Sequence, residues 1–169
     1  NLSKQFSEHT IDREYLALVW GKVIPRVGKI ESLISRSNRN RKKMMSSIIK
    51  GKTAITHYKT IDSFFDLKGN NVATLLSCKL ETGRTHQIRV HMAYKKNFLL
   101  GDKQYGKKNI KFKKINKEFE KNLKKLNRQA LHAKSLGFIH PKTNKFVNFE
   151  SEIPADFKKI LDLLNKLSN

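Results

Sequence analysis

The sequence predicts an α+β fold, in which a mixed, mainly antiparallel sheet is flanked by a few helices. Strand-like segments follow one another with short turns between them, and a clear amphipathic helix pattern occurs only near the C-terminal end. The 169 residues are 38% hydrophobic, which is enough to bury a core and excludes wholesale disorder. We therefore treat residues 1–169 as one domain.

The first half of the chain supplies three predicted strands. Residues 2–7 are typical of the end of a helix, and residues 13–22 are rich in apolar and aromatic side chains, which favours a strand. Residues 53–65 and 72–81 are two more strands, and residues 68–71 (Lys-Gly-Asn-Asn) supply the turn between them.

The second half supplies a hairpin and a helix. Residues 133–140 are β-like and are closed by Pro141, and residues 145–150 pair with them across residues 141–144. Pro154 suits the first turn of a terminal helix. Its apolar side chains recur at spacings of three and four: Phe157, Ile160, Leu161, Leu164 and Leu167.

The charge of the chain indicates a polyanionic partner. Lys and Arg number 36 against 14 Asp and Glu, a formal net charge of +22. Such a domain repels itself, and nucleic acid would relieve the repulsion because each neutralised phosphate releases counterions. A Lys bias inherited from an AT-rich genome is the alternative. The sequence favours RNA or DNA as the partner.

Several classes of protein are excluded by composition. No run of 18 apolar residues exists, which excludes a transmembrane helix. We expect no membrane as a partner. A single cysteine, Cys78, excludes a disulfide framework and a Cys-based zinc site. A reducing compartment fits, and we expect a cytoplasmic location.

Two segments concentrate the positive charge. Seven basic residues and no acidic residue lie between positions 36 and 52, and twelve lysines lie between positions 95 and 125. The second segment has few large apolar residues, which predicts a Lys-rich surface insertion at about 103–125. The first predicts a loop that contacts RNA phosphates, a solvated mobile connection being the alternative. The candidate RNA-binding residues are Arg36, Arg39, Arg41, Lys42 and Lys43.

The segment LETGRTHQIRVHM, residues 80–92, carries the clearest chemical signal. A strand ends at about Glu81, Gly83 permits a sharp turn, and the Thr85 hydroxyl is placed to cap a short helix. Ile88 and Met92 are four residues apart and would face the core. The junction of strand and helix, with free backbone N–H groups and two arginines, suits an anion.

The polar residues of the same helix divide between two sides. Arg84, Gln87 and His91 fall at spacings of three and four, and Arg89 lies about 100° round the helix from Ile88, where it reaches the edge of a cleft. His86 and His91 lie about 140° apart, which does not make a metal pair. Hydrogen-bonded structural histidines are the expectation.

The segment GRTHQIRVH resembles the signature of the RluA family of RNA pseudouridine synthases. Further segments match that family in order: REYLALVWG, ISRSNRNRKKM, GKTAITHYK, LLGDKQYGKK and RQALHAKSLGFIHP. The resemblance covers nearly the whole chain except the Lys-rich insertion. The details are most similar to the branch that modifies large-subunit ribosomal RNA.

The resemblance implies a reaction and residues for it. The family isomerises a flipped-out uridine of RNA to pseudouridine without cofactor or metal, by attack of an aspartate. Tyr15 matches the tyrosine that stacks on the target base, and Arg89 matches the arginine that pairs with the catalytic aspartate. Leu131 matches a residue in the wall of the base pocket, with an ordinary core leucine as the alternative. Lys52 matches a basic position close to the site. Arg84 and Gln87 are the remaining substrate-binding candidates.

One departure from the family bears on activity. The family's nucleophile lies in a segment of type H-R-L-D-x-x-T-S-G that precedes Gln5-Phe6, and none of the aspartates here has that context. We expect a preceding N-terminal part of the same protein to donate it, with the 169 residues inactive alone. Without that part, the sheet would expose an edge and apolar surface.

Three functions follow from the sequence. The first is isomerisation of a specific uridine in ribosomal RNA, 23S by the branch that the chain resembles. The second is a non-catalytic RNA-binding module acting in ribosome assembly. The third and weakest is an RNase that uses His86 in acid–base cleavage, which would break the RNA backbone whereas isomerisation leaves it intact.

Overall fold

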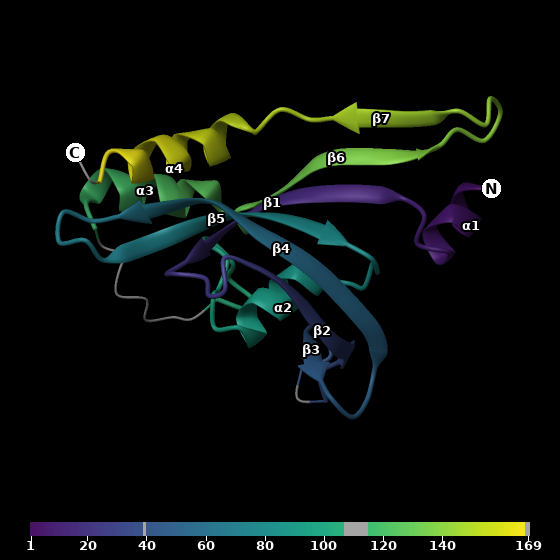
Figure 1. The fold of residues 1–169 in the computed structure, drawn as a ribbon. Helices are drawn as coiled ribbons and strands as arrows, with labels where there is room; N and C mark the ends of the chain where they lie inside the picture. The colour runs from purple at the N-terminus through teal and green to yellow at the C-terminus, as the bar shows by residue number, and fades with distance from the viewer. Residues whose placement is uncertain (39, 107–114, 168–169) are drawn as a thin grey trace.

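The computed structural model describes residues 1–38, 40–106 and 115–167, and Figure 1 shows its fold. One sheet of seven strands runs through these residues, in the order β3-β2-β4-β5-β1-β6-β7. The strands are β1 (Asp12–Trp20), β2 (Val27–Arg36), β3 (Met44–Ser47), β4 (Lys52–Phe65), β5 (Asn71–Leu80), β6 (Leu131–Ile139) and β7 (Phe146–Glu150). The helices are α1 (Leu2–Ser7), α2 (Gln87–Tyr94), α3 (Lys117–Leu126) and α4 (Ala155–Asn165).

Every strand pair of this sheet is antiparallel. The predicted α+β class is therefore confirmed, and the parallel component that a mixed sheet would need is absent from the described strands. The strands predicted at 13–22, 53–65, 72–81, 133–140 and 145–150 correspond to β1, β4, β5, β6 and β7. The predicted terminal helix is α4, with Pro154 at its N-cap.

Strand β1 divides the core because its side chains alternate between the two faces of the sheet. Leu16, Leu18 and Trp20 belong to a large cluster with residues of α3 and α4. Ala17 and Val19 belong to a second cluster, which includes Ile88 and Met92 of α2. Figure 1 shows α3 and α4 above the sheet and α2 below it. The prediction that Ile88 and Met92 face the core is confirmed.

The basic segment at 36–52 is more regular than the sequence suggested. Arg36 ends β2, and the four residues of β3 pair with Leu33–Arg36, so that a hairpin carries the positive charge. Strand β2 pairs along eight residues with the start of β4. Arg39 lies outside the described residues.

The Lys-rich segment is not a surface insertion along its whole length. Residues 117–126 form α3, in which Phe119, Leu123 and Leu126 are buried in the core while the lysines face solvent. The three buried side chains are spaced by four and three residues, which places them on one apolar face of the helix. Asn116 caps this helix by accepting a hydrogen bond from the backbone N–H of Phe119. Residues 107–114 of the predicted insertion lie outside the described residues.

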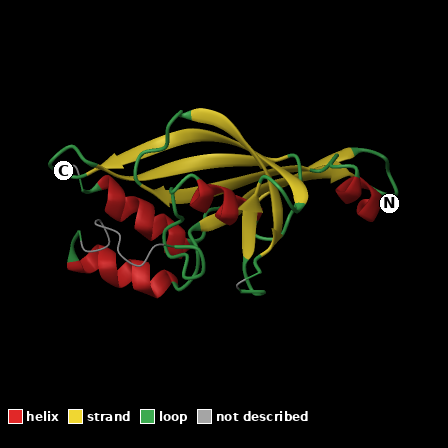
Figure 2. Ribbon diagram, turned by 90° about the horizontal axis from the view of Figure 1, so that it is seen from below, coloured by secondary structure: helices red, strands yellow, loops and turns green. Residues whose placement is uncertain are grey.

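The edge strand β7 exposes aromatic surface. Phe146 and Phe149 are both more than half exposed, and Phe138 of β6 stacks on Phe149 with ring centroids 5.9 Å apart. Figure 2 shows this hairpin extending away from α3 and α4, toward the N-terminal helix α1. In the described part of the chain, no helix has the length and apolar character needed to cross a membrane.

Candidate active site

The loop between β5 and α2 is built around one buried side chain, that of Gln87. Its Oε1 accepts hydrogen bonds from the Thr82 hydroxyl (2.7 Å) and the Arg84 backbone N–H (3.0 Å). Its Nε2 donates to the carbonyl of Ile55 (2.9 Å) and to the hydroxyl of Thr56 (3.0 Å). The side chain therefore fixes the loop to β4, which favours a positioning role for Gln87 over direct contact with substrate.

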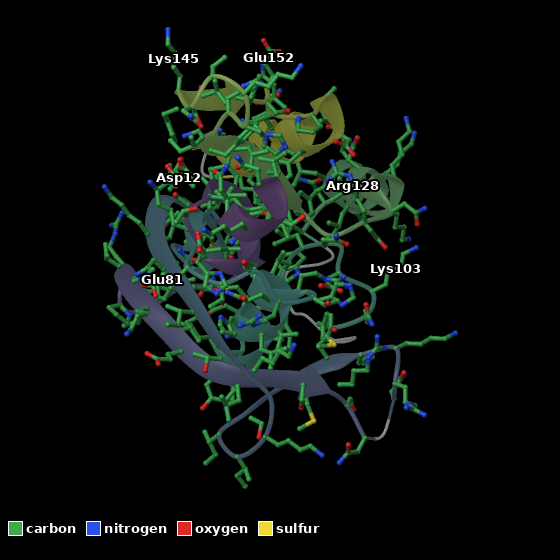
Figure 3. All side chains as sticks on the ribbon, turned by 90° about the vertical axis from the view of Figure 1, so that its right-hand side faces the viewer. Asp12, Glu81, Lys103, Arg128, Lys145 and Glu152 are labelled. Carbon is green, nitrogen blue, oxygen red and sulfur yellow. The ribbon has the colours of Figure 1, made fainter. Side chains whose placement is uncertain are left out.

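The N-terminus of α2 differs from the expectation that Thr85 caps it. The N-cap residue is His86, in the left-handed region with φ of 58°, and no side chain caps the helix. Arg84 donates from Nε to the carbonyl of Thr53 at 2.9 Å, which ties the loop to β4 a second time. In Figure 3, Glu81 at the start of this loop and Lys103 of the following loop lie to either side of α2.

Arg89 of α2 is held by a buried ion pair. Its Nε and Nη2 donate to the two carboxylate oxygens of Asp102 at 2.8 and 2.9 Å, and Nη2 also donates to Gln104 Oε1 at 3.1 Å. The ring of Tyr105 lies under the guanidinium, 4.8 Å from its centroid. Of the described residues, none accepts a hydrogen bond from Nη1, so this nitrogen is available to a further acceptor.

Asp102 is held ionised by its surroundings. Burial would raise the pKa of this carboxyl, but the hydrogen bonds and charge of Arg89, with backbone N–H groups of Tyr105 and Gln104, hold the pKa below its usual range. Gly101 precedes it with φ of 72°, and a Cβ there would lie 2.2 Å from the carbonyl oxygen of Arg128. The loop 101–106 thus presents a fixed anion to Arg89.

A pocket of about 260 Å³ lies between this arginine and the sheet. Tyr15, at a bulge in β1, and Arg89 both line it. The remaining lining residues come from the β5–α2 junction and from the start of β6: Leu80, Arg84, His86, Gln87, Ile88, Gln129 and Leu131. An aromatic ring, apolar walls and a guanidinium thus surround one cavity, which suits a planar polar ligand.

The loop 101–106 also contacts the basic hairpin. Gln104 Nε2 donates to the carbonyl of Lys42 at 2.6 Å, and the backbone N–H of Met44 donates to the Tyr105 hydroxyl at 2.8 Å. The same hydroxyl lies 2.9 Å from His86 Nδ1. One loop therefore holds Arg89 from one side and the hairpin from the other.

The two histidines of the motif have separate environments. His91 is fully buried, with Nδ1 2.8 Å from the Thr56 hydroxyl and Nε2 3.1 Å from the Ser32 hydroxyl. Burial lowers the pKa of His91 to about 4. Burial, and then the charge of Arg89, lower the pKa of His86. His91 is a hydrogen-bonded structural histidine, as expected, and neither histidine joins a metal-binding group within the described residues.

The candidate RNA-binding residues lie apart from this pocket. Arg36 and Arg41 line a polar hollow of about 570 Å³ on the hairpin, together with Lys50. Arg36 donates to the carbonyl of Arg41 at 3.1 Å, which closes the loop on itself. Lys42 and Lys43 belong to the same loop, between β2 and β3.

The structure thus brings five of the six predicted catalytic and substrate-binding residues to one pocket: Tyr15, Arg84, Gln87, Arg89 and Leu131. Lys52 does not line it and is exposed at the start of β4. Sequence reasoning assigned no role to Asp102, Gln104 and Tyr105, although all three stand in the GDKQYG segment quoted for the resemblance. The match of that segment to the family was the signal in the sequence that could have identified them.

Comparisons with known proteins identify the family of the chain. The family model described as RNA pseudouridylate synthase matches residues 1–94. A protein of Zymomonas mobilis named ribosomal large subunit pseudouridine synthase D is 43% identical over 164 residues, covering 96% of this chain and 48% of that protein. A protein of the same name from Neisseria meningitidis serogroup A is 41% identical, over 95% of this chain and 40% of its own length.

Solved structures show the same fold. Human RNA pseudouridylate synthase domain containing 4 aligns with a TM-score of 0.70 at 20% identity, over 96% of this chain and 66% of its own. Domain containing 1 aligns with a TM-score of 0.69 at 23% identity, over 90% of this chain and 58% of its own. The chain spans about half the length of the curated relatives named above. With the family model matching more than half of its residues, the chain belongs to the RNA pseudouridylate synthase family.

Proposed function

We propose that the protein to which these residues belong isomerises a uridine of large-subunit ribosomal RNA to pseudouridine. The observation that carries the proposal is the shared pocket, in which Tyr15 and Arg89 face one cavity from different elements. Relatives at 41–43% identity named as ribosomal large subunit pseudouridine synthases support ribosomal RNA as the substrate. We assign 23S RNA as the target on that basis.

Each side chain of the pocket has a role in this proposal. Tyr15 stacks on the flipped uracil, and Leu131 supplies an apolar wall that keeps water from the detached base. Arg84 binds the nucleotide at the mouth of the pocket. Arg89 uses its free Nη1 to orient the attacking carboxylate, while Asp102 holds the rest of the guanidinium in place.

The nucleophile of this proposal comes from outside the 169 residues. Neither Asp nor Glu is among the described residues that line the pocket, and Asp102 is engaged in its pair with Arg89. The isomerisation exchanges the bond from the sugar to the base nitrogen for a bond to C5, and the C5 proton leaves as the nitrogen gains one. The atoms balance without a cofactor, and the RNA backbone stays intact. The 169 residues alone are therefore inactive.

The decisive experiment maps pseudouridines in ribosomal RNA after incubation with the longer protein and with the 169 residues alone. We expect one modified uridine with the longer protein and none with the shorter chain. Arg89→Ala in the longer protein abolishes turnover while RNA binding persists, whereas Arg41→Ala weakens binding. Normal turnover by Arg89→Ala would overturn the assignment of the pocket.

A non-catalytic RNA-binding module is the second candidate. It is favoured by the lack of a carboxylate in the described lining of the pocket, together with a basic hollow that is separate from it. This candidate predicts that the longer protein binds ribosomal RNA and forms no pseudouridine in it. The same mapping experiment decides between the two.

A further inference from the structure

We propose that the β3–β4 connection, residues 48–51 and called the tip below, is an apolar wedge that inserts between nucleotides of the bound RNA. The proposal rests on the proposed function, because it takes RNA as the ligand. The tip is distinct from the pocket of Tyr15 and Arg89, and it adds a contact that the phosphate-binding residues cannot make.

The tip presents two isoleucines to solvent. Ile48 and Ile49 are 86% and 87% exposed, the highest values among the exposed large apolar side chains of the described residues. Burying such a side chain is favourable, so two adjacent ones left in water indicate a surface that another molecule covers.

The turn that carries the isoleucines has a defined structure. The Ser47 hydroxyl accepts hydrogen bonds from the backbone N–H groups of Ile49 (3.0 Å) and Lys50 (3.3 Å). Gly51 has φ of 142°, and a Cβ there would lie 2.7 Å from the Ile34 carbonyl oxygen. The turn therefore projects both apolar side chains from a fixed base at the end of β3.

The surroundings of the tip select an anionic partner. Residues 32–61 contain no Asp or Glu. Among the described residues, none of Arg36, Arg41, Lys50 and Lys52 forms an ion pair with a carboxylate. Lys50 follows the isoleucines directly and lines the polar hollow with Arg36 and Arg41. An apolar tip beside an uncompensated basic hollow matches RNA, in which apolar base faces lie between phosphates.

The position of the tip relates it to the candidate active site. Strand β3 begins at Met44, whose N–H binds Tyr105 of the loop that holds Arg89, and it ends at Ser47. Three residue steps along a strand span about 10 Å. The wedge thus lies one short strand away from the loop that holds Arg89, where it would unstack RNA close to the flipped uridine.

A control position exists in the same sheet. Leu67 is 80% exposed in the turn at the other end of β4, and Asp66 precedes it. It matches the tip in exposure and apolar character and is also followed by a lysine, Lys68, but it has an acidic neighbour and does not lie beside the basic hollow. Substitution at Leu67 should leave RNA binding unchanged.

The first test measures the affinity of the longer protein for a transcript of large-subunit ribosomal RNA across a salt titration. The double variant Ile48→Ser, Ile49→Ser should bind about tenfold more weakly with an unchanged salt slope, because the lost contact is apolar. Lys50→Ala should instead reduce the slope, and Leu67→Ser should change neither. Equal melting temperatures for all variants show that folding is intact.

The second test locates the tip on the RNA. Cys78 is the only cysteine of these residues and is fully buried, and burial raises the pKa of its thiol to about 12. In a longer protein whose other exposed cysteines are replaced, Ile49→Cys therefore offers one reactive thiol for an iron chelate that cleaves nearby RNA. We expect cleavage within a few nucleotides of the modified uridine, and none from a chelate at Leu67→Cys.

Each outcome has one meaning. Wild-type affinity of the double variant at every salt concentration, or no cleavage from position 49, overturns the wedge while leaving the enzyme proposal intact. A dimer that the double variant converts to a monomer assigns the tip to a second copy, and binding of the tip to anionic lipid vesicles assigns it to a membrane; both also overturn it. Absence of any RNA binding by the wild-type protein overturns the proposed function itself.

Discussion

The carboxylate of Asp102 and the guanidinium of Arg89 form a bidentate pair whose side chains are 1% and 10% exposed. A pair this far from solvent is costly to break, because removing one partner leaves an uncompensated buried charge. The pair fixes the position of Arg89, the residue that we propose to orient the attacking carboxylate.

Asp102→Asn should lower the free energy of unfolding by about 3–5 kcal/mol, because Arg89 then lacks its counter-charge. Urea denaturation followed by circular dichroism measures this. The matched control is Glu31→Gln, which removes an exposed pair with Lys29 and should cost less than about 1 kcal/mol. Equal costs for the two variants would show that the buried pair contributes no more than a surface pair.

Tyr105→Phe should loosen the hairpin without removing the ring beneath Arg89. The variant leaves the Met44 N–H without its acceptor and costs about 1–2 kcal/mol. Amide hydrogen exchange at Met44 should become faster. Tyr94→Phe is the control, since Tyr94 is 62% exposed on α2. Unchanged exchange at Met44 in Tyr105→Phe would mean that the hydroxyl does not hold the hairpin.

Stability should fall as the pH drops from about 6.5 toward 4, because the folded state binds the His91 proton less readily than the unfolded state. The pKa of His91 is about 4 in the fold against an ordinary 6.5, so its contribution is complete above 6.5 and is lost on acidification. The difference amounts to roughly 3 kcal/mol. Urea midpoints between pH 7 and 4 measure it, and His91→Gln should flatten the dependence. A His91→Gln profile with the wild-type slope would assign the effect to other groups.

Arg41→Ala should reduce the salt slope of RNA binding by about one and weaken affinity for unrelated RNA sequences equally. Its side chain lines the hairpin hollow and has no carboxylate partner among the described residues. Filter binding at several salt concentrations measures both effects. Lys166→Ala, beyond the end of α4, is the control and should retain the full slope. A loss of affinity that depends on RNA sequence would indicate base contacts instead.

Much of the fold follows from local patterns. The apolar and aromatic residues at 13–22 correctly predict a strand, and the spacing of Ile88 and Met92 correctly predicts that both side chains face the core. Strands β2 and β3 were both missed. Strand β3 has only four residues, two methionines and two serines, which carry no periodic signal. Helix α3 was also missed, although Phe119, Leu123 and Leu126 have a helical spacing of four and three. The many lysines around them favoured the prediction of a surface insertion.

The site was predicted only in part, because motifs locate single positions but not the contacts between distant segments. The resemblance identified the positions of Tyr15 and Arg89, and the structure places them at one pocket. The pairing of Arg89 with Asp102 joins residues thirteen positions apart across a turn, and no local rule selects Asp102 over the other aspartates. Only the tertiary arrangement shows that the GDKQYG loop contacts both the arginine and the hairpin.

Gly101 shows how a position without chemistry can control a site. The space that a methyl group would need there is already filled by the Arg128 carbonyl, so even alanine would push the following turn outward. Asp102 would retreat with it, and the arginine would lose its anchor while every reactive group remained in the sequence. Inactivating changes at residue 101 would then be mistaken for folding defects unless the orientation of that guanidinium were examined directly.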